Sequence, residues 1–298
     1  SYSGVFSDKN VGSGKTVTIT SSYAGADVSN YNITDQTSTT ANISAKALTA
    51  TASASNKVYD GSSAATSTLT LLGFVGSETV TSTNSSTFNN KNAGTGKTVT
   101  VNSITLADGT NGGLAANYSI STGQTTTANI TPKALTVSGN TASNKVYDST
   151  TNATTVLSFS GLIGSETINN TNSSTFDNKN IGTGKTVTVN SLTLVDGSNG
   201  GLASNYSISS GQTTTANVSA RPLTVSNISA SNKSYDGTTA VTLDTSNVSY
   251  NGLVSGDDFS GSFSGLFANE NIGSGRIVNI TSSYSGDDIG NYSITNQN

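Results

Sequence analysis

The chain of 298 residues contains no cysteine, histidine, methionine or tryptophan, and only two prolines. Without histidine or cysteine, neither a Ser–His nor a Cys–His nucleophile pair can be built. The same absences exclude disulfide bonds and zinc sites made of thiolate or imidazole ligands. Any bound metal would therefore be a hard cation held by oxygen atoms, and no organic cofactor is expected.

Charge is also scarce, with 13 basic and 17 acidic residues and a formal net charge of −4. So few basic residues argue against a protein that binds nucleic acid. No apolar run approaches the ~20 residues that a membrane-spanning helix needs, so no membrane insertion is expected. Because Ser1 and Tyr2 begin in the middle of a sequence pattern, we expect the chain to be a segment of a longer protein.

Serine, threonine, asparagine and glycine dominate the composition, but apolar residues alternate with them at a period of two. The segments 97–102 (KTVTVN) and 185–190 (KTVTVN) are two identical examples. Alternation of β-branched and polar residues is typical of a strand with one buried and one wet face. Helical spacing is absent over any useful length, so the sequence predicts an all-β fold of tandem β-sandwich-like units.

Three short strings recur along the chain in a fixed order, and successive copies of the first lie 88 residues apart. They are Asn-Lys-x-Tyr-Asp, Asn-x-Gly-x-Gly-Lys/Arg and Asn-Tyr-x-Ile. Residues 55–131 match residues 143–219 without a gap, and most positions are identical. Self-similarity at a fixed period is the signature of a repeat protein.

The strings divide the chain into a half-repeat and three longer repeats. The half-repeat (1–45) lacks the Tyr-Asp half, and it is followed by repeat A (46–132), repeat B (133–220) and repeat C (221–298). Repeat C stops before the strand that corresponds to residues 124–130 of repeat A. We therefore expect an open sheet edge in repeat C.

The junctions between these segments are very short and contain both prolines, Pro132 and Pro222. Proline fixes φ and interrupts a hydrogen-bond ladder, which marks these positions as joints. Short joints favour repeats held in line, each ~35–40 Å long from strands of seven to nine residues. We expect a monomeric, elongated rod whose partners are the neighbouring repeats of the same chain.

The Tyr-Asp element has two readings. In the structural one, the aspartate caps a turn and the tyrosine ring packs against the sandwich. In the functional one, exposed tyrosine rings stack on glycans. The signature consists of Tyr59, Asp60, Tyr147, Asp148, Tyr235 and Asp236.

Acidic residues cluster only in repeat C, where Gly-rich loops with carboxylates would suit calcium. Their spacing fits no EF-hand, so solvated loop acids are the competing interpretation. The calcium candidates are Asp257, Asp258, Asp287 and Asp288. A Lys–Asp isopeptide bond is a further hypothesis, and Lys57 with Asp60 or Glu78 is the pair it would use.

Catalytic motifs are weak. The string Gly94-Thr95-Gly96-Lys97 resembles the end of a phosphate-binding loop, but a strand rather than a helix should follow it. We interpret it as a glycine turn that opens the strand. Nearly every polar signature returns with each repeat, whereas a catalytic site would be expected once, so the sequence predicts no enzyme.

At the three strings the chain resembles the YDG repeats of large bacterial surface proteins, including filamentous-haemagglutinin-like adhesins. This family is distinct from the SRA-YDG domain that reads methylated DNA. The resemblance implies an extracellular, β-rich stalk at the bacterial cell surface and brings no catalytic residues with it. Ser149, Ser234 and Arg276 depart from the repeating pattern.

These observations lead to two functional hypotheses. In the first, the chain is a non-catalytic stalk of a large secreted adhesin, and it projects a distal binding domain in cell adhesion or biofilm formation. In the alternative, the repeats themselves bind glycans or a host or bacterial surface receptor multivalently.

Overall fold

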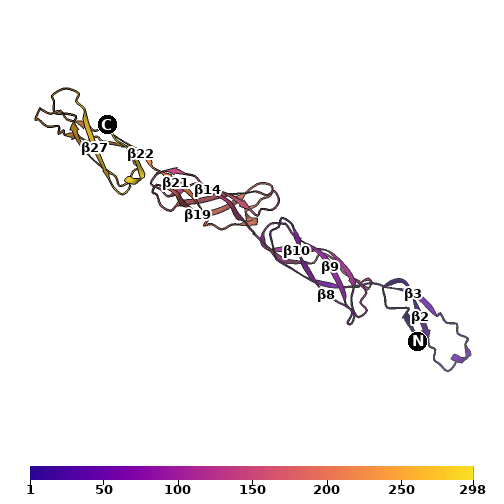
Figure 1. Ribbon diagram of the computed structural model, residues 1–298. Helices are drawn as coiled ribbons and strands as arrows, with labels where there is room; N and C mark the ends of the chain where they lie inside the picture. The colour runs from indigo at the N-terminus through magenta and orange to yellow at the C-terminus, as the bar shows by residue number, and fades with distance from the viewer. Residues whose placement is uncertain (298) are drawn as a thin grey trace. The chain divides into compact units, whose positions relative to one another are not determined.

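The computed structural model describes residues 1–297, and Figure 1 shows strands joined by loops along the whole chain. Strands account for 53 % of the structure, and its helical segments in the described part are four 3-10 turns of three residues. These turns are η1 (Val28–Asn30), η2 (Ala115–Asn117), η3 (Ala203–Asn205) and η4 (Ile289–Asn291). The predicted all-β class is confirmed. None of the described helical segments has the length and apolarity to cross a membrane.

The chain divides into two compact units, Ser1–Lys133 and Ala134–Asn298. The first unit contains the half-repeat and repeat A, and the second contains repeats B and C. In the first unit the half-repeat forms one antiparallel sheet of three strands in the order β1-β2-β3. These are β1 (Tyr2–Phe6), β2 (Gly12–Ser21) and β3 (Ser38–Ile43).

Repeat A is built from two kinds of sheet. A five-stranded sheet has the order β6-β12-β10-β9-β7, and β5 pairs with β8 in a separate two-stranded sheet. Strands β4 and β11 pair in parallel. The bounds are β4 (Lys46–Ala47), β5 (Thr49–Ala54), β6 (Lys57–Val58), β7 (Ala64–Ala65), β8 (Ser67–Leu72), β9 (Val80–Phe88), β10 (Gly94–Asp108), β11 (Tyr118–Ser119) and β12 (Thr125–Thr131).

Repeat B, in the second unit, repeats this topology. Its five-stranded sheet has the order β15-β21-β19-β18-β16, and β14 pairs with β17. The bounds are β13 (Lys133–Ala134), β14 (Thr136–Ala142), β15 (Lys145–Val146), β16 (Asn152–Ala153), β17 (Thr155–Ser160), β18 (Ile168–Phe176), β19 (Gly182–Asp196), β20 (Tyr206–Ser207) and β21 (Thr213–Ser219). Identical sequence patterns thus give identical strand orders.

Repeat C is less complete. Strand β22 lies between β25 and β28, while β26 and β27 form a sheet of only two strands. The bounds are β22 (Arg221–Ser226), β23 (Ser229–Ala230), β24 (Leu243–Asp244), β25 (Ser249–Asn251), β26 (Ser260–Phe267), β27 (Val278–Ser285) and β28 (Tyr292–Thr295). Within the described residues, β27 pairs with β26 alone.

The inner face of each five-stranded sheet is apolar because every second residue points inward. Val99 and Val101 of β10 are fully buried, as are Val187 and Val189 of β19. The two alternating segments singled out in the sequence are therefore confirmed as the central strands of their repeats.

The Gly-x-Gly-Lys string lies at the start of β10, but as a bulge rather than a turn. The pairing register with β12 shifts between Gly94 and Lys97. Gly96 has a φ of 59°, a conformation that glycine adopts without strain. Its N–H donates to the side-chain oxygen of Asn129 at 2.7 Å. This geometry attaches the terminal strand of the repeat to its centre.

Candidate functional site: the joints within the two units

The Tyr-Asp element forms the predicted turn in every copy. In repeat B, the Asp148 carboxylate accepts the N–H of Thr150 at 2.9 Å and the ammonium of Lys145 at 2.8 Å. The Lys145 ammonium also lies 5.4 Å from the centre of the Phe176 ring. Tyr147, next to this turn, is completely buried. The turn thus fixes a tyrosine ring at the end of the sandwich.

Tyr59 of repeat A is equally buried, whereas Tyr235 of repeat C is 67 % exposed. The turn is nevertheless the same, since Asp60 and Asp236 accept hydrogen bonds from Ser62 N–H and Thr238 N–H, both at 2.9 Å. The difference between the tyrosines therefore comes from what covers the ring and not from the turn itself.

Within the first unit, the half-repeat and repeat A meet at a joint that uses the other two strings. The side-chain oxygen of Asn117 accepts the N–H of Val11 at 2.9 Å, and its amide nitrogen donates to the Asn10 side chain at 3.0 Å. Beside it, the Lys9 ammonium donates to Glu78 at 2.6 Å, and Tyr118 donates to the same carboxylate at 2.7 Å.

The joint between repeats B and C, within the second unit, has the same pair of asparagine hydrogen bonds. We call this pair of bonds the clamp. Asn291 accepts the N–H of Ile181 at 3.0 Å, and its amide nitrogen donates to Asn180 at 3.2 Å. Asn291 is 3 % exposed, so these bonds form away from water. A buried side-chain amide whose oxygen and nitrogen are both hydrogen-bonded fixes the position of the loop that it contacts.

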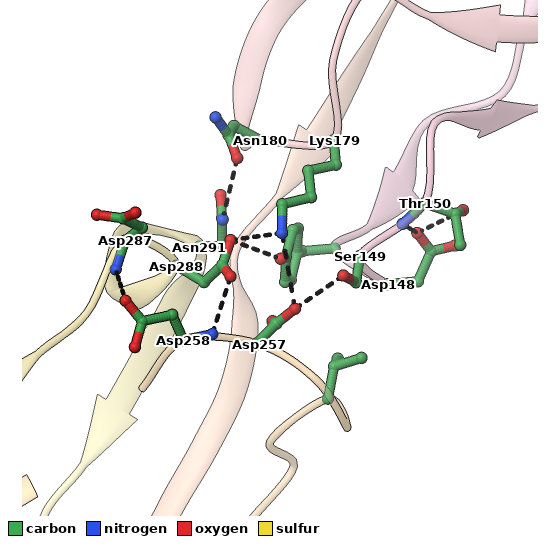
Figure 2. Close-up of polar contacts among 12 residues, drawn as sticks. Asp148, Ser149, Thr150, Lys179, Asn180, Asp257, Asp258, Asp287, Asp288 and Asn291 are labelled. Carbon is green, nitrogen blue, oxygen red and sulfur yellow. Dashed lines mark hydrogen bonds and ion pairs between the residues drawn. The ribbon is translucent and has the colours of Figure 1, made fainter. Parts of the chain in front are cut away.

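A charged centre lies beside this clamp, as Figure 2 shows. The Lys179 ammonium lies 2.7 Å from Asp288 and 3.8 Å from Asp257, and both carboxylates belong to the next repeat. The Asp257 side chain is only 1 % exposed. Charges taken out of water in this way are tolerated because they are paired and hydrogen-bonded.

The pairing shifts the ionisation of both partners. The hydrogen bond from Lys179 holds the pKa of Asp288 below its usual range, and the hydrogen bond to Asp288 raises the pKa of Lys179. Burial, together with the hydrogen bond to Asp257, raises the pKa of Tyr292 to about 12. In the first unit, the Lys9 ammonium likewise lowers the pKa of Glu78. Both joints therefore carry a lysine and an acid in their ionised forms at neutral pH.

Ser149 stands where the other two copies of the Tyr-Asp turn have a glycine, and its contacts account for this difference. It has a φ of 66°, in the left-handed region that favours the glycine found at this position in the other copies. Its hydroxyl donates to Asp257 at 2.7 Å. Asp257 stands where the other repeats have a glutamate, Glu78 or Glu166, since each of these three acids accepts the hydroxyl of the tyrosine in its repeat's Asn-Tyr string. Two deviations from the pattern, one in each repeat, are thus bonded to each other across the joint.

An apolar cluster continues through the joint of the second unit. It combines the buried Tyr147 with Leu223 and Tyr292 of repeat C. The rings of Tyr147 and Tyr292 meet edge to face, with their centres 5.6 Å apart. Its other buried members, all from repeat B, are Phe176, Val187, Ala216 and Val218. One apolar cluster therefore spans repeats B and C.

The four acids proposed for calcium lie close together but do not form a metal site. Asp257 and Asp288 both face Lys179, and Asp258 accepts the N–H of Asp287 at 3.0 Å. The described residues include no group of three or more acids arranged to hold a metal ion. Because an ammonium group lies between the two most buried carboxylates, this donor set does not fit calcium.

The surroundings of Lys57 do not favour the isopeptide hypothesis. Lys57 donates to Asp60 at 2.8 Å, but the Asp60 side chain is 54 % exposed, so the pair is an ordinary surface ion pair. Glu78, the alternative partner, is engaged by Lys9 and Tyr118.

Nothing in the sequence alone groups the four asparagines of the joints, Asn10, Asn117, Asn180 and Asn291. Each lies in a string that recurs in all copies, which was the available signal. The missing information was that the second string of one repeat meets the third string of the next.

Comparison with known proteins identifies the repeats. The model of the YDG domain matches residues 44–128, 131–216 and 219–298. Searches of curated proteins and of solved structures gave no match. Since the three matches cover most of the chain, the protein belongs to the YDG domain family and carries three tandem copies of this domain.

Proposed function

We propose that the chain is a structural, non-catalytic stalk segment of a large secreted bacterial adhesin, which holds a distal binding domain away from the cell surface in adhesion or biofilm formation. The observation that carries this proposal is the use of the recurring strings. Their asparagine, lysine and tyrosine side chains form joints between successive repeats, as at Asn117 and Asn291. A protein whose repeated residues connect its own repeats is suited to extension.

The connections between repeats support the proposal because they leave little freedom. Two residues separate β3 from β4, and one residue, Ala220, separates β21 from β22. The chain then enters a buried strand at once, since Leu223 and Val225 are almost fully covered. Stiff connections of this kind favour reach over flexibility.

The alternative, multivalent glycan binding by the signature tyrosines, receives less support. Stacking on a sugar needs an exposed ring, and Tyr59 and Tyr147 are at most 1 % exposed. Their rings are part of the apolar interior, which favours the structural interpretation of the Tyr-Asp element.

Small-angle scattering of residues 1–298 tests the mechanical part of the proposal. We expect an elongated particle, and a broader distribution of shapes in the double variant Asn117→Ala/Asn291→Ala, which removes both clamps. A compact globule from the unmodified chain would contradict the proposal. Antibodies against repeat B test the location, since they should label intact, unpermeabilised cells of the source bacterium.

A further inference from the structure

The joint loop of repeat C differs from its counterparts in one respect, the sign of its charge. The loops in the two described joints read Lys9-Asn10-Val11 and Lys179-Asn180-Ile181. The corresponding residues of repeat C are Glu270, Asn271 and Ile272. The asparagine and the apolar residue that form the clamp are retained, while the lysine is replaced by an acid.

In both described joints that lysine binds an acid of the following repeat. Lys9 meets Glu78 at 2.6 Å, and Lys179 meets Asp288 at 2.7 Å. Both contacts are direct ion pairs beside a clamp, where opposite charges attract and like charges repel. An acid at the position of the lysine is therefore incompatible with an acid of the following repeat.

The other residues of repeat C that correspond to joint residues are present and exposed to solvent. Tyr235, the counterpart of the buried Tyr147, is 67 % exposed, and Ile272 is 82 % exposed. Together with Glu270 and Asn271, these residues line a groove of about 580 Å³. The groove thus offers the same aromatic ring and clamp loop as the occupied joints, with the opposite charge.

Other charged groups lie around the groove. Lys233 is paired with Asp236 at 2.9 Å. Arg276 also lines the groove, and its Nη2 atom is buried without a hydrogen-bond partner among the described residues. The counterpart of Arg276 in repeat B, Lys185, is paired with Asp177, which is replaced by Ala268 in repeat C. Among these charged groups, Glu270 is the one that corresponds to Lys9 and Lys179, which contact the following repeat in the described joints.

We propose that the face formed by Tyr235, Glu270, Asn271 and Ile272 docks a YDG-type repeat that carries the usual Asn-Tyr pair and a lysine or arginine where Glu78 or Asp288 stands in this chain. The retained clamp residues select the Asn-Tyr pair, and the acid selects the basic residue. Charge complementarity then determines which repeat follows repeat C.

A second copy of this chain does not meet the requirement. The half-repeat carries Asp27 at the position of Asp288, next to Asn30 and Tyr31. An aspartate facing Glu270 would repel it, so the charge reversal also opposes head-to-tail association of identical chains.

The test extends the full chain at its C-terminus with a second copy of residues 38–132, which supplies a terminal strand followed by repeat A. Three versions differ only at the appended Glu78, which is kept, changed to glutamine or changed to lysine. Hydrogen exchange of the Ile272 amide reports docking, because its counterpart Ile181 donates to Asn291 in the described joint. We expect about tenfold slower exchange with lysine than with glutamate, and an intermediate rate with glutamine.

Glu270→Lys should reverse this order, while Arg276→Gln should leave it unchanged. Equal exchange in all three versions, or slowest exchange with glutamate, would overturn the inference. The inference rests on the joints of the proposed stalk. The Ile181 and Val11 amides of the same molecules report whether those joints form, independently of the charge at position 270. Free exchange of the Ile181 and Val11 amides would contradict the joints of the proposed stalk. Slow exchange at these two amides, with free exchange at Ile272 in every version, would contradict the charge selection alone.

Discussion

The side-chain oxygen of Asn291 accepts the backbone N–H of Ile181 although 110 residues separate the two in the chain. Asn117 and Val11 form the same bond in the other unit across 106 residues. In both cases an asparagine of one repeat satisfies a backbone group of the repeat before it. In both units this contact connects the recurring strings of two successive repeats.

Asn291→Ala should weaken the joint of the second unit. The change leaves the Ile181 N–H and the Asn180 side chain without their partner, and an unsatisfied buried donor costs about 1–3 kcal/mol. Thermal unfolding followed by circular dichroism should show a lower Tm. Asn247→Ala is the matched control, because Asn247 is exposed and bonds only to the adjacent Ser246. An unchanged Tm in Asn291→Ala would mean that the clamp contributes nothing.

Lys179→Met should destabilise the second unit more than Lys233→Met, since Lys233 of the same unit pairs with Asp236, whose side chain is 53 % exposed. Removing the ammonium leaves Asp288 and the buried Asp257 facing each other without a cation. The double variant Lys179→Met/Asp288→Leu should recover part of the loss, because it removes one of the two repelling charges. Additive effects in this mutant cycle, measured by urea unfolding, would show that the two residues do not interact.

Acid should weaken both joints. The folded-state pKa values of Glu78 and Asp288 lie below those of the unfolded chain, so their stabilisation is present above about pH 4 and is lost as pH falls through the folded pKa. The Tm should therefore fall as the pH drops below about 4. Lys179→Met should reduce this dependence in the second unit. A Tm independent of pH in this range would contradict the ion pairs.

Asn140→Ala should stabilise repeat B. Both polar atoms of this amide are buried and lack a hydrogen-bond partner in the described structure, and repeat A has Ala52 at the corresponding strand position. Removing an unsatisfied buried amide gains on the order of 1 kcal/mol. A higher midpoint of urea unfolding is the expected result, and a lower midpoint would show that Asn140 has a stabilising role.

The strands and the Tyr-Asp turn could be predicted from the sequence because they depend on neighbouring residues. Alternation around Val99 and Val187 defines a strand face, and aspartate followed two residues later by an N–H defines a turn.

The joints could not be predicted in this way, because residues over 100 positions apart meet in them. The acids of repeat C were instead interpreted as calcium ligands or solvated loops, since nothing local shows that Lys179 lies between Asp257 and Asp288. One signal was present: Ser149 and Asp257 both depart from the repeat pattern, and they are bonded to each other.

Hydrogen exchange of the Val11 and Ile181 amides in the unmodified chain shows whether asparagine side chains clamp successive repeats together. Neither amide lies in a strand, so only the clamp should protect it. The account predicts slow exchange at both positions and fast exchange at Val11 in Asn117→Ala and at Ile181 in Asn291→Ala. Exchange as fast as in an exposed loop, in the unmodified chain, would contradict it.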